Sequence, residues 1–324
     1  MRILIILPNW LGDAIMATPA IELLSKYHPN ARFTFVGSYV SIEALKHHPK
    51  CERAIIDETK KASNRFIATY KLAKELGEFH LAITFRNQLH SSLLLRLTNT
   101  VVCLAKRSWH SIFLLSHTPT IKANKHLALQ YAQLAMTNVD NYVDDIDVLK
   151  LYIEPKKHQR PTLGINAGAT YGSAKRWYPE RFAEVAAAFS DKFDIIIFGG
   201  PGEVEMAKEI EDNLVSLNIS NYTNIAGKTN IQELCANIAG CSLFITNDSG
   251  PMHVAAAYQV PTVAIFGPTK HKETSQWMNE KSKIVREDIE CAPCMKRECP
   301  LKHHDCMKMI TASKVIEAVR ELGF

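Results

Sequence analysis

Three short stretches of the chain combine residue types that bind phosphate, and each directly follows an apolar run. The first is "FITNDSGPMHVAAA" at 244–257, where a polar turn precedes Pro251 and an alanine-rich segment. Proline suits the first position of a helix, where its missing N–H has no partner. The free N–H groups and the helix dipole favour an anion at such a terminus. The candidate phosphate-binding residues here are Asp248, Ser249, Gly250 and His253. The alternative is that Asp248 or Ser249 only caps the helix.

The second stretch is "NAGATYGSAKRW" at 166–177, which is rich in Gly, Ser and Thr. Such a loop offers N–H and hydroxyl donors to phosphate oxygens, and Lys175 adds positive charge. We expect Lys175 to neutralise a leaving diphosphate. The alternative is a solvated lysine beside a flexible loop. Two phosphate-type loops in one half of the chain favour phosphate binding.

The third stretch, "FGGPGEVE" at 198–205, is glycine-rich but contains no G-x-G-x-x-G. The first apolar run of the chain also leads to "PNWLGD" instead of a glycine fingerprint, which disfavours an NAD-linked oxidoreductase. Glu203 or Glu205 could accept hydrogen bonds from ribose hydroxyls. The alternative is that both carboxylates only complement the dipole of the following helix.

A single carboxylate, Asp13, follows the first apolar run of the chain in "LPNWLGDA". We interpret it as a general base that removes a proton from an attacking hydroxyl. The alternative is an N-cap of the following helix. Phosphate-type loops in one half and a lone carboxylate in the other suit a group transfer.

Short apolar strands alternate with helical patterns along the chain, which predicts parallel sheets covered by helices on both faces. The expected strands are 2–7, 32–37, 53–57, 81–85, 101–105, 162–168, 194–200, 242–247 and 262–267. The expected helices are 14–27 (with a kink at Pro19), 63–77, 88–97, 179–189, 203–214, 231–239, 251–258 and 311–322. This alternation predicts two doubly wound, Rossmann-like domains in an α/β fold.

"EPKKHQRP" at 154–161 interrupts the alternation with two prolines and several basic side chains, and we place the domain linker there. The expected domains are therefore 1–155 and 161–324, the second with a Cys-rich loop at 291–306. Ligands of open α/β sheets bind at the carboxyl ends of the strands. We expect the two sheets to face a central cleft in this way.

The composition is that of a globular protein, with 47% hydrophobic and 22% charged residues among 324. A formal net charge of +5 suits an anionic ligand or a membrane surface but falls short of a nucleic-acid-binding tail. The apolar run "ILIIL" is stopped by Pro8 and is too short for a signal peptide or a membrane span. We expect a cytoplasmic protein.

Four of the eight cysteines are crowded into the spacing C-x2-C-x4-C-x6-C. They are Cys291, Cys294, Cys299 and Cys306. Four soft ligands in a short loop could hold a structural zinc ion, whereas a catalytic metal would need an open position. An iron–sulfur cluster or reduced thiols remain alternatives. The same loop leaves a metal-stabilised nucleic-acid-binding protein as an alternative class, although the basic residues do not cluster around aromatic ones.

Four blocks resemble the bacterial heptosyltransferases of glycosyltransferase family 9 in content, order and spacing. They are "NWLGDAIMATPAIELL", "NAGATYGSAKRW", "NDSGPMHVAAA" and "FGPT". The resemblance spans nearly the whole chain and is strongest to the enzymes that add the second inner-core heptose. It implies a GT-B fold and an inverting transfer from ADP-heptose to a lipid-A-linked Kdo/heptose acceptor. It also implies no catalytic cofactor and no nucleic acid, with peripheral contact at the inner membrane. Enzymes that add the first or third heptose remain alternatives.

The resemblance also assigns roles, with acceptor binding in 1–155 and donor binding in 161–324. Asp13 would be the catalytic base, and the donor residues would be Thr170, Lys175, Glu205, Thr229, Asp248, Ser249, Gly250 and His253. Lys270 stands where family members often carry an acidic residue. Candidate acceptor-binding residues are Arg86, Lys106 and Arg107, whose alternative is a solvated basic face. The segment 107–115 would be an amphipathic membrane-facing surface or, alternatively, a core helix.

Overall fold

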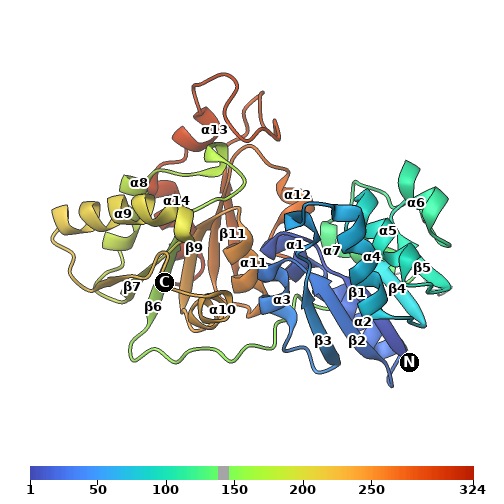
Figure 1. The fold of residues 1–324 in the computed structure, drawn as a ribbon. Helices are drawn as coiled ribbons and strands as arrows, with labels where there is room; N and C mark the ends of the chain where they lie inside the picture. Colours follow the sequence, from blue (N-terminus) through green and yellow to red (C-terminus); the bar gives the residue numbers. More distant parts are fainter. Residues whose placement is uncertain (138–145) are drawn as a thin grey trace. The chain divides into compact units, whose positions relative to one another are not determined.

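The computed structural model describes residues 1–137 and 146–324, which divide into two compact units (Figure 1). Unit 1 is Met1–Tyr152 and unit 2 is Ile153–Phe324. Residues 154–161, the predicted linker, contain no helix or strand and belong to unit 2. There the Lys156 N–H donates to the Ala236 carbonyl at 2.9 Å, so this segment is tied to the unit that follows it.

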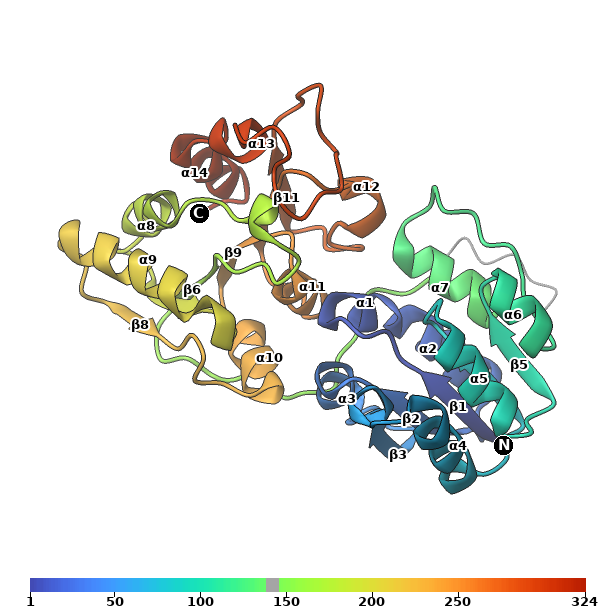
Figure 2. The ribbon, with the colours of Figure 1, turned by 45° about the horizontal axis from the view of Figure 1, so that its top comes forward.

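Unit 1 is built on a parallel sheet with the strand order β3-β2-β1-β4-β5. Its strands are β1 (Arg2–Ile6), β2 (Arg32–Gly37), β3 (Cys51–Ile56), β4 (Leu81–Thr84) and β5 (Val102–Ala105). The central strand β1 is fully buried from Ile3 to Ile6 because helices cover both faces of the sheet (Figure 2). The predicted strands of this half are confirmed.

The helices of unit 1 are α1 (Leu11–Met16), α2 (Thr18–Tyr27), α3 (Tyr39–Leu45), α4 (Arg65–Leu76), α5 (Leu89–Leu97), α6 (Trp109–Leu114) and α7 (Leu127–Ala135), with a 3-10 turn η1 (Thr59–Lys61). The predicted single helix 14–27 was wrong, because α1 ends at Met16 and α2 begins at Thr18. Pro19 lies in the first turn of α2. A proline there needs no N–H partner, so it begins a new helix instead of kinking an existing one.

Unit 2 has a second parallel sheet, with the strand order β11-β10-β9-β6-β7-β8. Its strands are β6 (Thr162–Asn166), β7 (Asp194–Phe198), β8 (Tyr222–Asn224), β9 (Leu243–Asn247), β10 (Thr262–Phe266) and β11 (Ser282–Arg286). The sequence patterns did not predict β8 or β11. Both lie at sheet edges, where half-exposed strands need no continuous apolar run.

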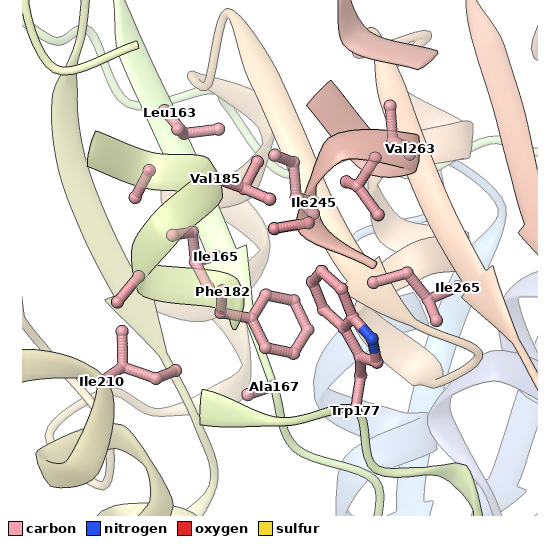
Figure 3. Packing of buried hydrophobic residues seen from close by; sticks show 14 of the residues in the cluster. Leu163, Ile165, Ala167, Trp177, Phe182, Val185, Ile210, Ile245, Val263 and Ile265 are labelled. Carbon is pink, nitrogen blue, oxygen red and sulfur yellow. The ribbon is translucent and has the colours of Figure 1, made fainter. Parts of the chain in front are cut away.

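The helices of unit 2 are α8 (Pro179–Ala187), α9 (Val204–Ser216), α10 (Ile231–Ala239), α11 (Gly250–Ala257), α12 (His271–Thr274), α13 (Asp305–Lys308) and α14 (Ala312–Glu321), with 3-10 turns η2 (Ser173–Lys175) and η3 (Pro201–Glu203). Trp177 is the largest fully buried side chain, and Figure 3 shows it beside Phe182, Ile245 and Ile265. Its ring meets that of Phe182 edge-on at 4.9 Å, and its indole N–H donates to the Ile310 carbonyl at 2.9 Å.

Each sheet has one point at which the chain connections diverge in opposite directions. In unit 1 this point lies between β1 and β4, and in unit 2 between β6 and β9. Loops that leave adjacent strands in opposite directions open a crevice at the carboxyl edge, which is where open α/β sheets bind ligands. Three of the predicted loops begin there: 166–177 after β6, the turn at 248–250 after β9, and the Asp13 loop after β1.

Among the described residues, no helix is both long enough and apolar enough to cross a membrane.

Candidate functional site

Helix α11 begins at Gly250, and in the described part of the chain no side chain makes a capping hydrogen bond to it. Ser249 is its N-cap residue, but the Ser249 hydroxyl instead accepts from the Asn166 amide at 3.2 Å. Ser249 therefore holds the N-cap position that the alternative expected, but its side chain makes no capping hydrogen bond. Pro251 occupies the first turn, as predicted, and His253 is buried. The first-turn amides remain in place for an anion.

A buried ion pair joins the two predicted phosphate loops. The Lys175 ammonium lies 2.6 Å from Oδ2 of Asp248 and 3.2 Å from the Asp248 backbone carbonyl. Thr269, the last residue of the "FGPT" block, donates its hydroxyl to the same carboxylate oxygen at 2.5 Å. Both charged side chains are largely buried, with 13% and 5% exposed. The carboxylate therefore fixes Lys175 and balances its charge.

Two asparagines tie the ends of β6 and β9 together. The Asn247 side chain donates to the Ala167 carbonyl and accepts from the Trp177 backbone N–H at 3.2 Å. Asn166 donates to the Gly168 carbonyl at 3.2 Å as well as to Ser249. Both side chains are buried. The loop 166–177 is thus bonded to the β9 end from both sides.

Of the two candidate ribose carboxylates, Glu203 lies against the glycine loop and Glu205 does not. Glu203 accepts from the Gly200 N–H at 2.7 Å. Its carboxyl group is so close to Gly168 that a Cβ there would come within 2.1 Å of it. Glu205 is exposed in the first turn of α9. Thr170 is also exposed, and Thr229 is half-buried before α10.

The Cys-rich loop packs on the loop that carries Lys175. Tyr171 donates its hydroxyl to the Met295 carbonyl at 2.8 Å, and the Ala174 N–H donates to the Arg297 carbonyl at 3.0 Å. Gly172 allows this approach, because a Cβ there would lie 2.2 Å from the Arg297 carbonyl oxygen. The Cys-rich loop therefore supports one wall of the phosphate loops.

The four predicted metal ligands line one cavity, together with two histidines. The lining residues with candidate ligand atoms are Cys291, Cys294, Cys299, Cys306, His303 and His304. Burial, and the neighbouring cysteines, raise the pKa of the Cys306 thiol to about 11. In residues 1–137 and 146–324, however, no group of three such side chains is arranged to hold a metal ion. Four thiols suit zinc chemically, and the structural zinc stays a prediction.

In unit 1, Asp13 lies in the first turn of α1 and is half-buried. The N-cap position belongs to Trp10, so the interpretation of Asp13 as an N-cap is wrong. Helix α1, which carries Asp13, packs against α7, and there burial, together with the Asp13 charge, raises the pKa of the Tyr131 phenol. The carboxylate thus stands at the carboxyl edge of the sheet, near the half-buried Tyr131 phenol.

The three predicted acceptor-binding residues lie in different environments. Arg86 follows β4 and is only 7% exposed, so the alternative of a solvated basic face is wrong for this residue. Its Nη1 donates to Asp57 at 2.8 Å. Lys106 is half-buried and donates to the Gln130 side chain at 3.4 Å, whereas Arg107 is exposed.

The predicted segment 107–115 contains α6, which presents large apolar side chains to solvent. Trp109 is 70% exposed, Phe113 is 85% exposed and Ile112 is 44% exposed. The alternative of a core helix is therefore wrong for this segment.

The chain resembles known proteins over its whole length. A model of glycosyltransferase family 9 (heptosyltransferase) matches residues 69–304. Lipooligosaccharide heptosyltransferase 2 of Campylobacter jejuni is 41% identical over 99% of this chain and 98% of its own length. Lipopolysaccharide heptosyltransferase 2 of Escherichia coli is 26% identical over 99% and 98%.

A solved structure shows the same fold. The E. coli ADP-heptose lps heptosyltransferase II superimposes with a TM-score of 0.84 at 24% identity, covering 99% of this chain and 98% of that one. The predicted GT-B fold class is confirmed.

Replacing Asp248 with alanine tests the buried pair. Asp248→Ala leaves the Lys175 ammonium without its counter-charge, and removing one partner of a buried pair costs about 3–5 kcal/mol of the free energy of unfolding. The control is Glu273→Ala, which breaks the more exposed pair between Lys270 and Glu273. That change should cost about 0–1 kcal/mol. Denaturant unfolding measures the free energy of unfolding of both variants. An equally small loss in the two would contradict a structural role for the pair between Lys175 and Asp248.

Proposed function

We propose that this chain, which belongs to glycosyltransferase family 9, transfers heptose from ADP-heptose onto the inner core of lipopolysaccharide or lipooligosaccharide. The observation that carries this proposal is the uncapped N-terminus of α11 beside Lys175, in a chain 41% identical to a lipooligosaccharide heptosyltransferase 2. We assign the step to the second heptose, added to heptosyl-Kdo-lipid A. The C. jejuni and E. coli relatives, both heptosyltransferases 2, support that step.

The donor diphosphate would lie on the first turn of α11. Gly250 has no side chain to block the approach of phosphate oxygens to the amides, and Lys175 would supply positive charge as the diphosphate leaves. Asp248 is a carboxylate and would repel a diphosphate directly. Its contacts with Lys175 and Thr269 support a positioning role instead.

The ribose of the donor would bind to Glu203. The family resemblance favoured Glu205, but Glu205 is exposed on α9, whereas the Glu203 carboxyl group lies against Gly168 at the start of the loop 166–177. Only one oxygen of Glu203 accepts from the Gly200 N–H. The other can accept from a ribose hydroxyl.

Asp13 would act as the general base. It takes the proton from the attacking hydroxyl of the acceptor as that oxygen bonds to the anomeric carbon, and the bond to the ADP oxygen breaks. One displacement inverts the anomeric configuration. The first turn of a helix favours the ionised carboxylate that this role needs.

The exposed side chains of α6 support a peripheral contact with the cytoplasmic face of the inner membrane, where a lipid-linked acceptor would be presented. Trp109, Ile112 and Phe113 form the apolar part of this surface, and Arg107 adds positive charge. Aromatic and basic side chains together suit an anionic lipid surface.

Truncated core acceptors that carry Kdo only, one heptose or two heptoses test the assigned step. We expect transfer from ADP-heptose to the one-heptose acceptor, measured by mass spectrometry of the products. Transfer to another acceptor alone would overturn the step and keep the reaction. The absence of transfer to all three would contradict the proposed function.

An Asp13→Asn variant tests the base. We expect transfer to fall by a factor of about 10²–10⁴, because a general base contributes that much. The dissociation constant for ADP-heptose, measured by calorimetry, should stay within about twofold, since Asp13 belongs to unit 1. Asp147→Asn, at an exposed carboxylate of the same unit, is the control. A near-wild-type rate in Asp13→Asn would exclude this role.

Replacing Phe113 with serine tests the membrane contact. We expect the Phe113→Ser protein to cosediment with vesicles containing anionic lipid less than the wild type does, because an 85% exposed aromatic ring is lost. Phe66→Ser, at a 57% exposed ring on α4, is the control. Equal sedimentation of both variants and the wild type would contradict a role for α6.

A further inference from the structure

The region after β4 in unit 1 contains buried nitrogen atoms that lack hydrogen-bond partners. The Arg86 Nε donates to the Leu7 carbonyl at 2.6 Å and its Nη1 donates to Asp57, but its Nη2 has no partner among the described residues. The same holds for Nε of Arg65 and Nδ1 of His90. A buried donor without a partner loses the hydrogen bonds it made to water, so several together are energetically costly.

These three side chains come from separate elements that meet at one place. Arg65 begins α4, His90 lies in the first turn of α5, and these two helices pack together (Figure 2). The ring of Phe66, next to Arg65, lies 5.0 Å from the His90 ring. Burial lowers the pKa of both His90 and Arg86, and the positive charge of Arg65 lowers both further. The packing of α4 on α5 and the charge interactions of Arg65 with both other groups thus place the three side chains in one region.

The carboxylate of Asp57, which lies beside Arg86, already accepts hydrogen bonds from protein groups. Asp57 pairs with Arg86 through Oδ2, at 2.8 Å. Its Oδ1 accepts from the Thr59 N–H at 3.1 Å and from the Thr59 hydroxyl at 2.6 Å. Both oxygens of Asp57 thus already accept hydrogen bonds, and of the three side chains Arg86 is the one paired with it. An added anion would balance the charge and bond the nitrogens that lack partners.

Arg86 lies at the edge of the sheet where open α/β folds bind their ligands. Arg86 follows β4 and bonds to the carbonyl of Leu7 at the end of β1, so its guanidinium bridges the two strands between which the connections diverge. The loop to Asp13 leaves the same end of β1. A ligand held by Arg86 would therefore lie at the sheet edge that carries the proposed base.

We propose that Arg65, Arg86 and His90 form an oxyanion subsite that binds an acidic group, a carboxylate or a phosphate, of the acceptor. This inference rests on the proposed function, which it extends to the chemistry of acceptor recognition. Guanidinium groups bond such oxyanions in pairs of parallel hydrogen bonds. Arg65 and His90 were not among the predicted site residues, and Arg86 acts with them instead of with Lys106 and Arg107.

The test is an Arg65→Gln variant, because Arg65 is less buried than Arg86 and does not hold the Asp57 pair. The control is Arg96→Gln, at an exposed arginine in the last turn of α5. We expect the KM for the acceptor to rise about tenfold or more in Arg65→Gln, from the loss of a charge-assisted hydrogen bond. The KM for ADP-heptose and the unfolding midpoint should match those of the control.

Two modified acceptors separate the possible anions, one lacking its phosphates and one with its carboxylates reduced to alcohols. The difference between Arg65→Gln and Arg96→Gln should vanish for the acceptor that lacks the recognised group. Equal acceptor KM values in the two variants would overturn the subsite and would mean that water satisfies the buried nitrogens.

A binding measurement keeps the subsite testable without transfer. With saturating ADP present, inorganic phosphate should raise the unfolding midpoint of the wild type and Arg96→Gln more than that of Arg65→Gln. If the wild type transfers nothing but shows this difference, the proposed function fails and the oxyanion subsite stands. The same phosphate effect in all three proteins would overturn the subsite.

Discussion

The ion pair between Lys175 and Asp248 is the interaction on which the rest of the unit 2 site depends. Two buried charges are stable only where the geometry is good and further hydrogen bonds satisfy the carboxylate. The 2.6 Å contact and the Thr269 hydroxyl meet both conditions. With Lys175 fixed, the loop after β6 lies beside the first turn of α11, and the Cys-rich loop packs on its other side.

Both units place their chemistry where the strand connections diverge. In unit 2, Asn166 and Asn247 bond the ends of β6 and β9 to the loops that follow them. In unit 1, Arg86 links the ends of β4 and β1. Buried polar side chains at these points satisfy backbone groups that the sheet leaves without partners, and they orient the loops. The same topology thus positions the proposed diphosphate site in one unit and the proposed acidic-group site in the other.

The sequence predicted the strands that are buried on both faces, because short continuous apolar runs bounded by turn residues, such as that of β1, are typical of them. It also predicted the loop after β9, because Pro251 and Gly250 have local conformational roles. It could not predict that Lys175 pairs with Asp248, 73 residues away, since no local pattern encodes that contact. The choice of Glu203 over Glu205 as the ribose ligand depended on the packing of Glu203 on Gly168, which no local pattern shows. Arg65 and His90 became candidates only when folding left their nitrogens buried.

A crystal structure with bound ADP tests the donor site most directly. We expect the diphosphate on the first-turn amides of α11, with a phosphate oxygen within hydrogen-bond distance of the Lys175 ammonium and a ribose hydroxyl on Glu203. A diphosphate bound away from α11, or a ribose held by Glu205 with Glu203 still bonded only to Gly200, would contradict the proposed donor site.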